Sequence, residues 1–452
     1  MVQAGDEARG GERILIRVLL TGIRIILVIL YSFRSTVLGQ VQLNKLDSLT
    51  LEQAVKLALE HHPSLRAAAA NLESASSGLT VALAGYYPSV IGSASFSRTD
   101  GAFVLNPTFP PRNQSYNTYT TGVQMTETVF DFGKTIGKVS ANSGFVDAAS
   151  ADQEATRQSV ILNAQLAYFN LIQAKQVITV DEEALGQAKK HLAQAKAFYS
   201  VGRRPQSDVT KAEVDLANAD VNLIRARNQM RLAKVSLENT MGVHPTADYR
   251  VREVFEVPPF SMRLDSAEVV AFQERPELIA AHARVAANRS LVSATWDQHL
   301  PTIGAFGNWT WSNFDFPLFS RWNAGLTFTL PIFQGFAISA QVDQARAAAD
   351  VALANLDLLN ETARLEVEQN YLGLKEAEDR IGATAKLLEQ AEENLRLANG
   401  EYAAGVGTPI EVADAQLSLS NAQITRIQAL SDYNGFLIRL QRSMGILGRR
   451  KE

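Results

Sequence analysis

The sequence contains no cysteine and only 14 prolines among its 452 residues. The absence of cysteine excludes disulfide bonds, cysteine-ligated zinc, iron–sulfur clusters, a cysteine nucleophile and a lipid anchor on cysteine. An excess of one charge is also lacking, because 43 basic residues stand against 47 acidic ones and the net charge is -4. Such a balance gives no electrostatic footprint for nucleic acid, so nucleic-acid binding is not expected. The hydrophobic fraction of 46% and the charged fraction of 20% are those of a folded chain.

The prolines are spaced so unevenly that two long windows, 112–204 and 332–408, contain none. Nothing in these windows obliges a helix to end. Each window is followed by a proline, Pro205 or Pro409, and then by a shorter proline-free run. This pattern predicts a very long helix followed by a medium helix in each half of the chain.

The first 40 residues are basic and then apolar, with small residues around Gly39. This order is typical of a secretory signal peptide, which we place at residues 1–39. Arg24 and Arg34 bracket an apolar core that is too short for a transmembrane helix. An uncleaved anchor and a misassigned start codon are the alternative interpretations. No later segment has 18 consecutive apolar residues.

The two halves of the chain resemble one another, which is the mark of an internal duplication. Tyr199 and Gly202 recur as Tyr402 and Gly405, and ten further identities keep the same spacing of 203 residues. Upstream the spacing becomes 213, which implies a ten-residue insertion in the first half, at the loop 99–116. Each half shows the same order: a helix, two strands, a very long helix and a medium helix.

The duplication predicts boundaries along the whole chain. The first repeat covers 48–242 and the second covers 265–445, with an equatorial linker at 243–264 and a C-terminal tail at 446–452. The expected elements are a first helix at about 50–85, strands at about 87–98, 116–130, 301–312 and 321–332, long helices at 134–200 and 335–402, and medium helices at 206–241 and 409–444.

The long helices carry apolar residues at alternating spacings of four and three. In the first half this register runs from Val160 to Tyr199, with one polar exception at Asp181. It continues in the following helix from Val209 to Leu237, where large and small residues alternate. The second half repeats it with polar exceptions at Asn370 and Thr384. Such seams predict an elongated layer of helical hairpins, in which a continuous helix pairs with a broken one.

The four segments between the helices change to a period of two, as strands do. Their length suits tilted membrane strands, and Trp309, Trp311 and Trp322 lie near their ends. Two soluble hairpins packed on the helices are the alternative interpretation. The helices already use their apolar seams on each other, which leaves no separate core for hairpins to cover. Four strands are too few to close a barrel, so several copies of the chain must contribute.

The element order and three turn motifs resemble those of the TolC-type outer membrane factor family. The motifs are the strand-to-helix turns at 129–133 and 331–335 and the interhelical turn at 402–409, and the resemblance covers 48–445. It implies a mainly helical fold with a membrane β-barrel. In a homotrimer, four strands from each protomer would form a 12-stranded barrel in the outer membrane, and the helices would form a periplasmic tunnel. The implied function is a passive exit duct of a tripartite efflux pump or type I secretion system, not an enzyme, working with a periplasmic adaptor protein and an inner-membrane pump.

The same resemblance implies a closed gate at the interhelical turns. Tyr402 and Asp208 would be lock partners between neighbouring helical hairpins, and Glu411 and Asp414 would line the constriction. Their i, i+3 spacing puts these last two on one helical face, so threefold symmetry would place six carboxylates around a narrow lumen. Apart from the resemblance, a solvated helix face near a turn is the simpler interpretation.

Some members of the family place a gate-locking arginine where this chain has Gly407. Arg203 or Arg204 in the other turn could substitute for it. The turns are also the implied docking surface for the adaptor, although glycine ends the preceding helix and proline starts the next whether or not a partner binds. The residues assigned to docking are Val201, Gly202, Arg203, Pro205, Gly405, Gly407, Thr408 and Pro409.

No motif for catalysis, a cofactor or a metal is found in the sequence. Gly133-Lys134-Thr135 is similar to the end of a phosphate-binding loop, but Thr128 stands where that loop requires glycine. The six histidines are scattered and form no His-Glu-x-x-His pattern, so surface or packing roles suffice for them. The rival function is a periplasmic coiled-coil scaffold without channel activity, whose hairpins only mediate oligomerisation.

Overall fold

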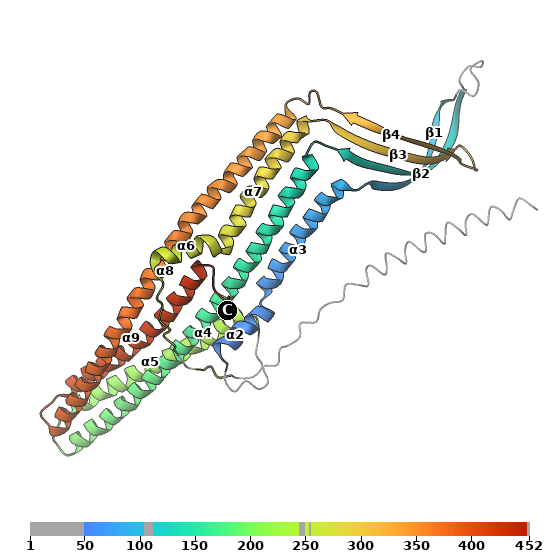
Figure 1. The fold of residues 1–452 in the computed structure, drawn as a ribbon. Helices are drawn as coiled ribbons and strands as arrows, with labels where there is room; N and C mark the ends of the chain where they lie inside the picture. The colour runs from blue at the N-terminus through green and yellow to red at the C-terminus, as the bar shows by residue number, and fades with distance from the viewer. Residues whose placement is uncertain (1–48, 104–111, 244–248, 253–254, 450–452) are drawn as a thin grey trace, which may run out of the picture. The chain divides into compact units, whose positions relative to one another are not determined.

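The computed structural model describes residues 49–103, 112–243, 249–252 and 255–449. The same order of elements occurs twice (Figure 1). The first half contains α2 Leu51–His61, α3 Pro63–Leu83, η1 Ala84–Tyr86, β1 Ser89–Phe103, β2 Arg112–Phe130, α4 Lys134–Ser200 and α5 Gln206–Met241. The second half contains α6 Leu264–Glu274, α7 Pro276–Trp296, η2 Asp297–His299, β3 Thr302–Asn313, β4 Phe319–Thr329, α8 Ala337–Ala404 and α9 Pro409–Ser443. The mainly helical, duplicated fold with very long helices and a single antiparallel sheet in these residues is confirmed.

Some of the predicted segments lie outside the described residues. The signal peptide predicted at 1–39 is one, and the connection 104–111, within the predicted insertion site, is another. The equatorial linker at 243–264 and the tail at 446–452 are described only in part. The first hairpin is longer than expected, because β1 extends to Phe103 and β2 begins at Arg112.

The first predicted helix of each half is divided into two helices by a proline. α2 ends at His61, His62 is extended, and Pro63 is the first residue of α3. Proline pushes the preceding residue out of the helical region, and its missing N–H is harmless at a helix start. The break recurs between α6 and α7, where Arg275 is extended before Pro276. The single helix expected at about 50–85 is therefore wrong.

Each long helix is preceded by two consecutive residues in the left-handed region. They are Phe132 and Gly133 before α4, with φ of 57° and 114°, and Gly335 and Phe336 before α8, with φ of 60° and 64°. Phenylalanine rarely adopts this conformation because its Cβ crowds the backbone. Asp131 supports the first turn, since its carboxylate accepts hydrogen bonds from the backbone N–H groups of Gly133 and Thr135 at 3.3 and 2.8 Å.

The four strands form one antiparallel sheet in the order β1-β2-β3-β4. Trp309 of β3 lies opposite Trp322 of β4. Among the described residues, β1 and β4 each pair on one side only, so the sheet has two open edges. Unpaired edges leave a row of backbone donors and acceptors available to another strand.

The described helices do not cover the sheet, which meets the helical layer at one end (Figure 1). Trp309 is 53% exposed and Phe328 is 65% exposed. Trp322 and Leu326 are each 75% exposed. The alternative of hairpins packed on the helices, with one face in a core, is therefore wrong.

The long helices fold back on the medium ones to form two antiparallel hairpins, α4–α5 and α8–α9. The two turns of these hairpins lie together at the end of the helices remote from the sheet (Figure 1). α7 packs beside both α4 and α8, and α3 packs beside α4. The buried residues of α4 include the seam positions Ala164, Leu171, Ala174 and Asp181, and also residues off the seam such as Ile172. None of the described helices combines the length and the apolar character needed to cross a membrane.

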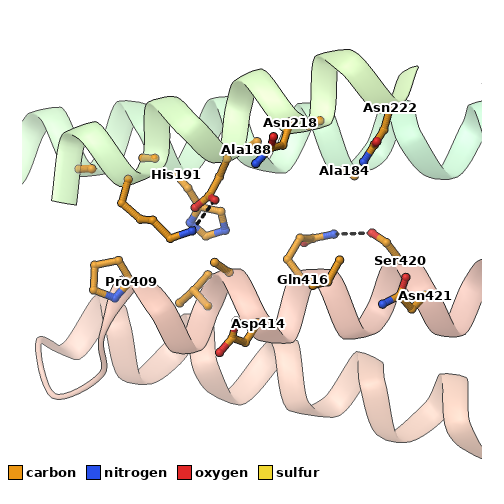
Figure 2. A pocket seen from close by; sticks show the side chains of 18 of the residues that line it. Ala184, Ala188, His191, Asn218, Asn222, Pro409, Asp414, Gln416, Ser420 and Asn421 are labelled. Carbon is orange, nitrogen blue, oxygen red and sulfur yellow. Dashed lines mark hydrogen bonds and ion pairs between the residues drawn. The ribbon is translucent and has the colours of Figure 1, made fainter. Parts of the chain in front are cut away.

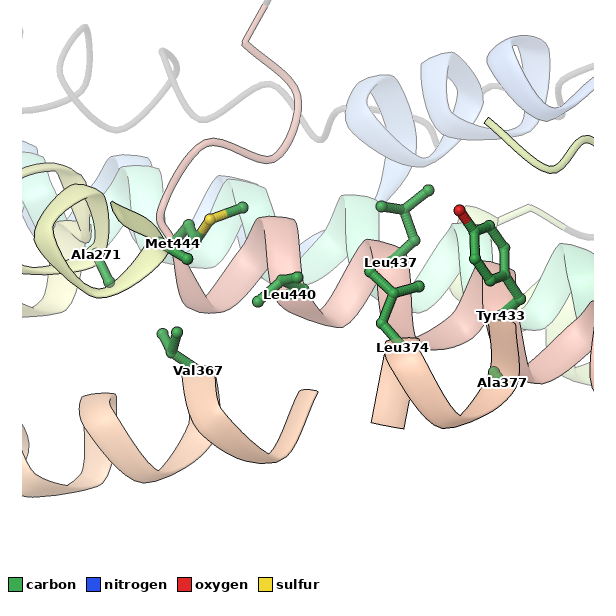
Figure 3. Packing of buried hydrophobic residues seen from close by; sticks show 9 residues of the cluster. Ala271, Val367, Leu374, Ala377, Tyr433, Leu437, Leu440 and Met444 are labelled. Atoms are coloured by element: carbon green, nitrogen blue, oxygen red, sulfur yellow. The ribbon is translucent and has the colours of Figure 1, made fainter. Parts of the chain in front are cut away.

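A buried hydrophobic cluster joins α6, α8 and α9 (Figure 3). Val367 and Leu374 of α8 pack against Leu440 of α9 and Met444 at its C-cap, and all four are nearly inaccessible. Tyr433 closes one side, where its hydroxyl donates a hydrogen bond to the carbonyl oxygen of Pro258. Burial of this kind stabilises a helix pair by about 1.5–3 kcal/mol for each large side chain.

Beside this cluster, ion pairs around the buried Arg275 tie the break between α6 and α7 to α8 and α9. Arg275, 5% exposed, contacts Glu366 at 2.6 Å and Glu277 at 3.4 Å. Arg442 of α9 also pairs with Glu277. Burial raises the pKa of Glu277, but the hydrogen bond and charge of Arg442 outweigh this and leave the pKa below its ordinary value. The network therefore fixes the start of α7 to both helices of the α8–α9 hairpin.

Candidate functional site

The two interhelical turns are built from matching residues at a spacing of 203. Gly202 and Gly405 have φ of 69° and 84°, so each supplies the left-handed residue that ends a long helix. Pro205 and Thr408 then stand at the N-caps of α5 and α9. The predicted docking residues therefore lie in the two turns, and most are exposed, but Gly407 is buried.

The second turn is stabilised by local hydrogen bonds and is tightly packed at Gly407. Thr408 and Glu411 form a capping box, in which the Glu411 carboxylate accepts a hydrogen bond from the Thr408 N–H at 2.7 Å. Gly407 N–H donates to the carbonyl oxygen of Glu401 at 2.9 Å. A Cβ on Gly407 would lie only 2.9 Å from the backbone nitrogen of Tyr402. No side chain fits at position 407 without a shift of this turn.

Tyr402 is the aromatic centre of the two turns. It is 2% exposed and packs edge-on against Phe198 of α4, with the ring centroids 5.8 Å apart. The Arg204 guanidinium lies over its ring at 5.4 Å. Burial raises the pKa of the Tyr402 hydroxyl above its ordinary 10.0, the charge of Arg204 lowers it, and the charge of Asp208 raises it. Residues of both hairpins therefore meet at this tyrosine.

Arg204 also makes the polar contact between the two turns. Its Nη2 donates a hydrogen bond of 2.7 Å to the carbonyl oxygen of Gly407. Arg203 is exposed. Position 204 is the repeat counterpart of position 407. The second turn has no arginine at position 407, and Arg204 of the first turn contacts the backbone there.

Tyr402 and Asp208 are close enough to influence each other electrostatically, but no hydrogen bond joins them in the described residues. Asp208 Oδ2 is buried without a hydrogen-bond partner. Glu411 and Asp414 are both exposed, as expected for residues at a lumen or in solvent. The Glu411 carboxylate is already engaged by its own helix cap, so it and Asp414 differ in their local roles.

A cavity of about 370 Å³ lies between the two hairpins, beginning at the turns (Figure 2). Helices α4, α5 and α9 contribute most of its lining. Asp208 and Asp414 line it, together with His191, Gln416 and the buried Asp181. His191 Nε2 and Gln416 Oε1 are buried without hydrogen-bond partners. Burial lowers the pKa of His191 despite the opposing charge of Asp215.

Sequence reasoning missed this cavity, because its walls come from helices far apart in the chain. Asp181 was visible only as a polar interruption of an apolar seam, and a packing role sufficed for His191. The described residues contain no group of three histidine or acidic side chains able to hold a metal ion.

Comparison with known proteins gives one consistent result. The family model described as outer membrane efflux protein matches residues 54–243 and 269–446. The outer membrane efflux protein BepC of Brucella suis is 25% identical over 392 residues, covering 85% of this chain and 83% of BepC. Protein CyaE of Bordetella pertussis is 25% identical over 417 residues, covering 90% of this chain and 86% of CyaE.

Solved structures show the same fold. The Campylobacter jejuni CmeC outer membrane channel superposes with a TM-score of 0.81 at 21% identity, covering 89% of this chain and 87% of CmeC. The outer membrane protein VceC of Vibrio cholerae gives a TM-score of 0.78 at 22% identity, covering 87% of this chain and 96% of VceC. With the family model matching both repeats, this chain belongs to the outer membrane efflux protein family.

Proposed function

We propose that three copies of this chain form a passive exit duct in the outer membrane, gated at the two interhelical turns. The observation that carries the proposal is the open-edged sheet, whose large apolar side chains are exposed at the end of long helices. Lipid tolerates no unpaired strand edge, so β1 of one copy must pair with β4 of another until the sheet closes. The family, a set of non-enzymatic outer membrane efflux channels, supports the same function and replaces the scaffold alternative.

Exposed apolar stripes on the helices support the association of copies. Val351, Leu358, Leu365 and Leu372 of α8 are all more than half exposed and recur every seven residues. Val214, Val221 and Val235 form a similar stripe on α5. A heptad repeat keeps such residues on one face of a helix, where a neighbouring helix can cover them.

The trimer is tested on a gel. The purified protein, in detergent and without heating, should migrate as an oligomer and shift to the monomer position on boiling, because a closed barrel resists detergent. Chemical crosslinking before electrophoresis should stop at three copies. A single monomer band in every sample would contradict the trimeric duct.

Arg204 rather than Arg203 would hold the gate closed. A charge-assisted hydrogen bond contributes about 1.5–3 kcal/mol, so its removal corresponds to at least a roughly tenfold shift toward the open state. In planar lipid bilayers, Arg204→Ala should show at least about tenfold more open time than the wild type. The matched control is Arg203→Ala, which should behave as the wild type. Equal behaviour of the two variants would remove Arg204 from the gate.

The acidic pair at the turns would favour cations in the narrowest part of the duct. Glu411 and Asp414 lie at i, i+3 on α9 and are both exposed. Because Glu411 also caps its helix, Asp414→Asn is the cleaner variant. We expect it to reduce the cation preference measured from the reversal potential under a salt gradient, with the helix content unchanged. An unchanged reversal potential would place Asp414 outside the constriction.

The turns would also dock a periplasmic adaptor that connects the duct to an inner-membrane pump. Val201 and Val406 are 67% and 80% exposed at the two turns, which is unusual for valine. Since the chain has no cysteine, Val201→Cys and Val406→Cys each introduce a unique crosslinking site. Both should crosslink a protein of the periplasm in intact cells, whereas the exposed control Asp220→Cys on α5 should not. Relatives named as efflux pump outer membrane proteins support this assembly.

A further inference from the structure

Asp181 is a largely buried residue whose carboxylate has no partner among the described residues. It occupies a seam position of α4, is 9% exposed, and lines the cavity between the hairpins. No donor or cation among the described residues contacts it, and burial alone raises its pKa above the ordinary 3.8. A carboxylate that has lost much of its hydration favours a compensating positive charge nearby.

The second half of the chain shows what an ordinary polar residue does at this position. The repeat counterpart of Asp181 is Thr384 of α8, which is equally buried. Its hydroxyl donates a hydrogen bond of 2.8 Å to the carbonyl oxygen of Arg380, one turn back in the same helix. An ionised carboxylate has no hydrogen to donate, so Asp181 in its charged form cannot be satisfied in this way.

Other groups in the cavity also lack donors. Gln416 Oε1 and His191 Nε2 are buried without hydrogen bonds. Because its lowered pKa favours the neutral imidazole, His191 can accept at Nε2 when its proton lies on Nδ1. Among the described residues of the lining, with neutral His191 left aside, the one cationic side chain is that of Lys211, which is paired with Asp215 at 2.7 Å. The cavity therefore has unused acceptors and an uncompensated negative charge.

The spacing of these groups favours a long ligand over a compact ion. Asp181 and His191 lie about 15 Å apart along α4, at ~1.5 Å per residue. Ala184 and Ala188 lie between them on the cavity side (Figure 2). Within the described part of the chain, no three ligands converge to hold a metal ion. Methylene groups can pack on the alanines while amine groups reach the acceptors at either end.

We propose that this cavity binds a linear polyamine, with one ammonium group paired with Asp181 and the chain extended along α4 toward His191 and Gln416. The bound amine contacts both hairpins, because Asp181 belongs to α4 and Gln416 to α9. It would thereby help to keep the two hairpins together. An extended tetra-amine such as spermine has a length comparable to the separation of Asp181 and His191.

Isothermal titration calorimetry with spermine on the full-length protein in detergent, at physiological salt, tests the proposal. The wild type should bind about one spermine per chain. Asp181→Thr, which places the counterpart residue in the seam, should weaken binding at least about tenfold, and Asp181→Asn should do the same if the threonine variant folds poorly. The matched control Asp220→Asn removes an exposed carboxylate of α5 outside the cavity and should bind as the wild type does.

Ligand length and charge type sharpen the test. The shorter 1,4-diaminobutane should bind more weakly than spermine, and Mg²⁺ at equal concentration should not displace spermine. The proposal is overturned by the absence of saturable binding, by equal affinity in both Asp181 variants and the wild type, or by displacement with Mg²⁺. Binding is measured without any conductance, so its outcome is independent of whether the protein forms the proposed duct.

Discussion

The two interhelical turns descend from one duplicated sequence, yet they have become unlike in structure. The second turn carries a full cap from Thr408 and Glu411, whereas at the first turn Pro205 stands at the N-cap and no side chain caps α5. The second turn accepts a hydrogen bond at Gly407, and the first donates it from Arg204. The second turn is therefore the rigid one and accepts the hydrogen bond, whereas the first turn supplies the arginine side chain that donates it.

The same division separates the two acidic residues that follow the turns. Asp208 and Glu411 are repeat counterparts at the third position of their helices. Glu411 completes its cap, while Asp208 Oδ2 is buried in the cavity without a partner. The tyrosines differ as well, since Tyr402 is 2% exposed and its counterpart Tyr199 is 47% exposed. The duplication thus places similar residues at equivalent positions of the two turns, but these residues make different contacts and have different structural roles.

The largest expected effect comes from adding a methyl group to the rigid turn. Gly407→Ala would place Cβ 2.9 Å from the Tyr402 nitrogen and 3.0 Å from the carbonyl carbon of Glu401. We expect a cost of about 2 kcal/mol, as for overpacking elsewhere, together with faster hydrogen–deuterium exchange at residues 400–412.

The first turn provides the matched control. A Cβ on Gly202 meets nothing within 4 Å, although its φ of 69° strains a substituted residue. Gly202→Ala should therefore cost only about 1 kcal/mol, with faster exchange confined to the first turn. An equal or larger effect of Gly202→Ala would contradict the assignment of the second turn as the rigid one.

An intermediate effect is expected from truncating the two counterpart acids. Glu411→Ala removes half of a capping box and should destabilise the start of α9 by about 1 kcal/mol. Asp208→Ala loses only a favourable charge at a helix start and also removes a buried unpaired oxygen, so its net effect should stay below about 0.5 kcal/mol. Thermal unfolding followed by circular dichroism, with exchange at each turn, measures both. Equal losses would show that the first turn is capped after all.

The smallest expected effect is a pH dependence of stability that arises in the first hairpin and has no equivalent in the second. Burial lowers the pKa of His191 from 6.5, whereas its repeat counterpart Asn394 does not titrate. A group whose folded pKa is lowered contributes stability above pH 6.5, and this contribution is lost as the pH falls through the folded value. His191→Gln should therefore flatten the fall in melting temperature between pH 8 and pH 5. An unchanged slope would show that other groups cause it.

Most helices, strands and turns could be predicted from the sequence, because the patterns that indicate them lie within each segment. Proline and glycine mark both turns, and the apolar spacing identifies the long helices. The break at His62 could have been read from Pro63, because a residue before proline is pushed out of the helix; the continuous apolar pattern concealed it. The repeat itself held the clue to the gate arginine, since positions 204 and 407 are counterparts. That clue singles out Arg204 over Arg203, whose counterpart is Val406, and the hydrogen bond from Arg204 to Gly407 agrees with it.

The cavity could not be predicted in the same way. Its lining combines α4, α5 and α9, and the meeting of Asp181 with His191 and Gln416 depends on how two hairpins are set against each other. Asp181 did carry a signal, as a charged residue in an otherwise apolar seam. Whether such a residue is solvated, paired or buried alone is decided by the neighbouring helices, which the periodicity of one helix does not describe.

The open edges of the sheet have a genetic consequence. In a duct formed by three chains, the edge strands of each protomer must pair with those of both neighbours. One subunit with a damaged β1 or β4 would therefore prevent closure of the whole barrel. A cell that made sound and damaged subunits in equal amounts would assemble only about one wholly sound ring in eight. Mutations at these edges should therefore behave as dominant, even though the altered subunit retains all of its helices.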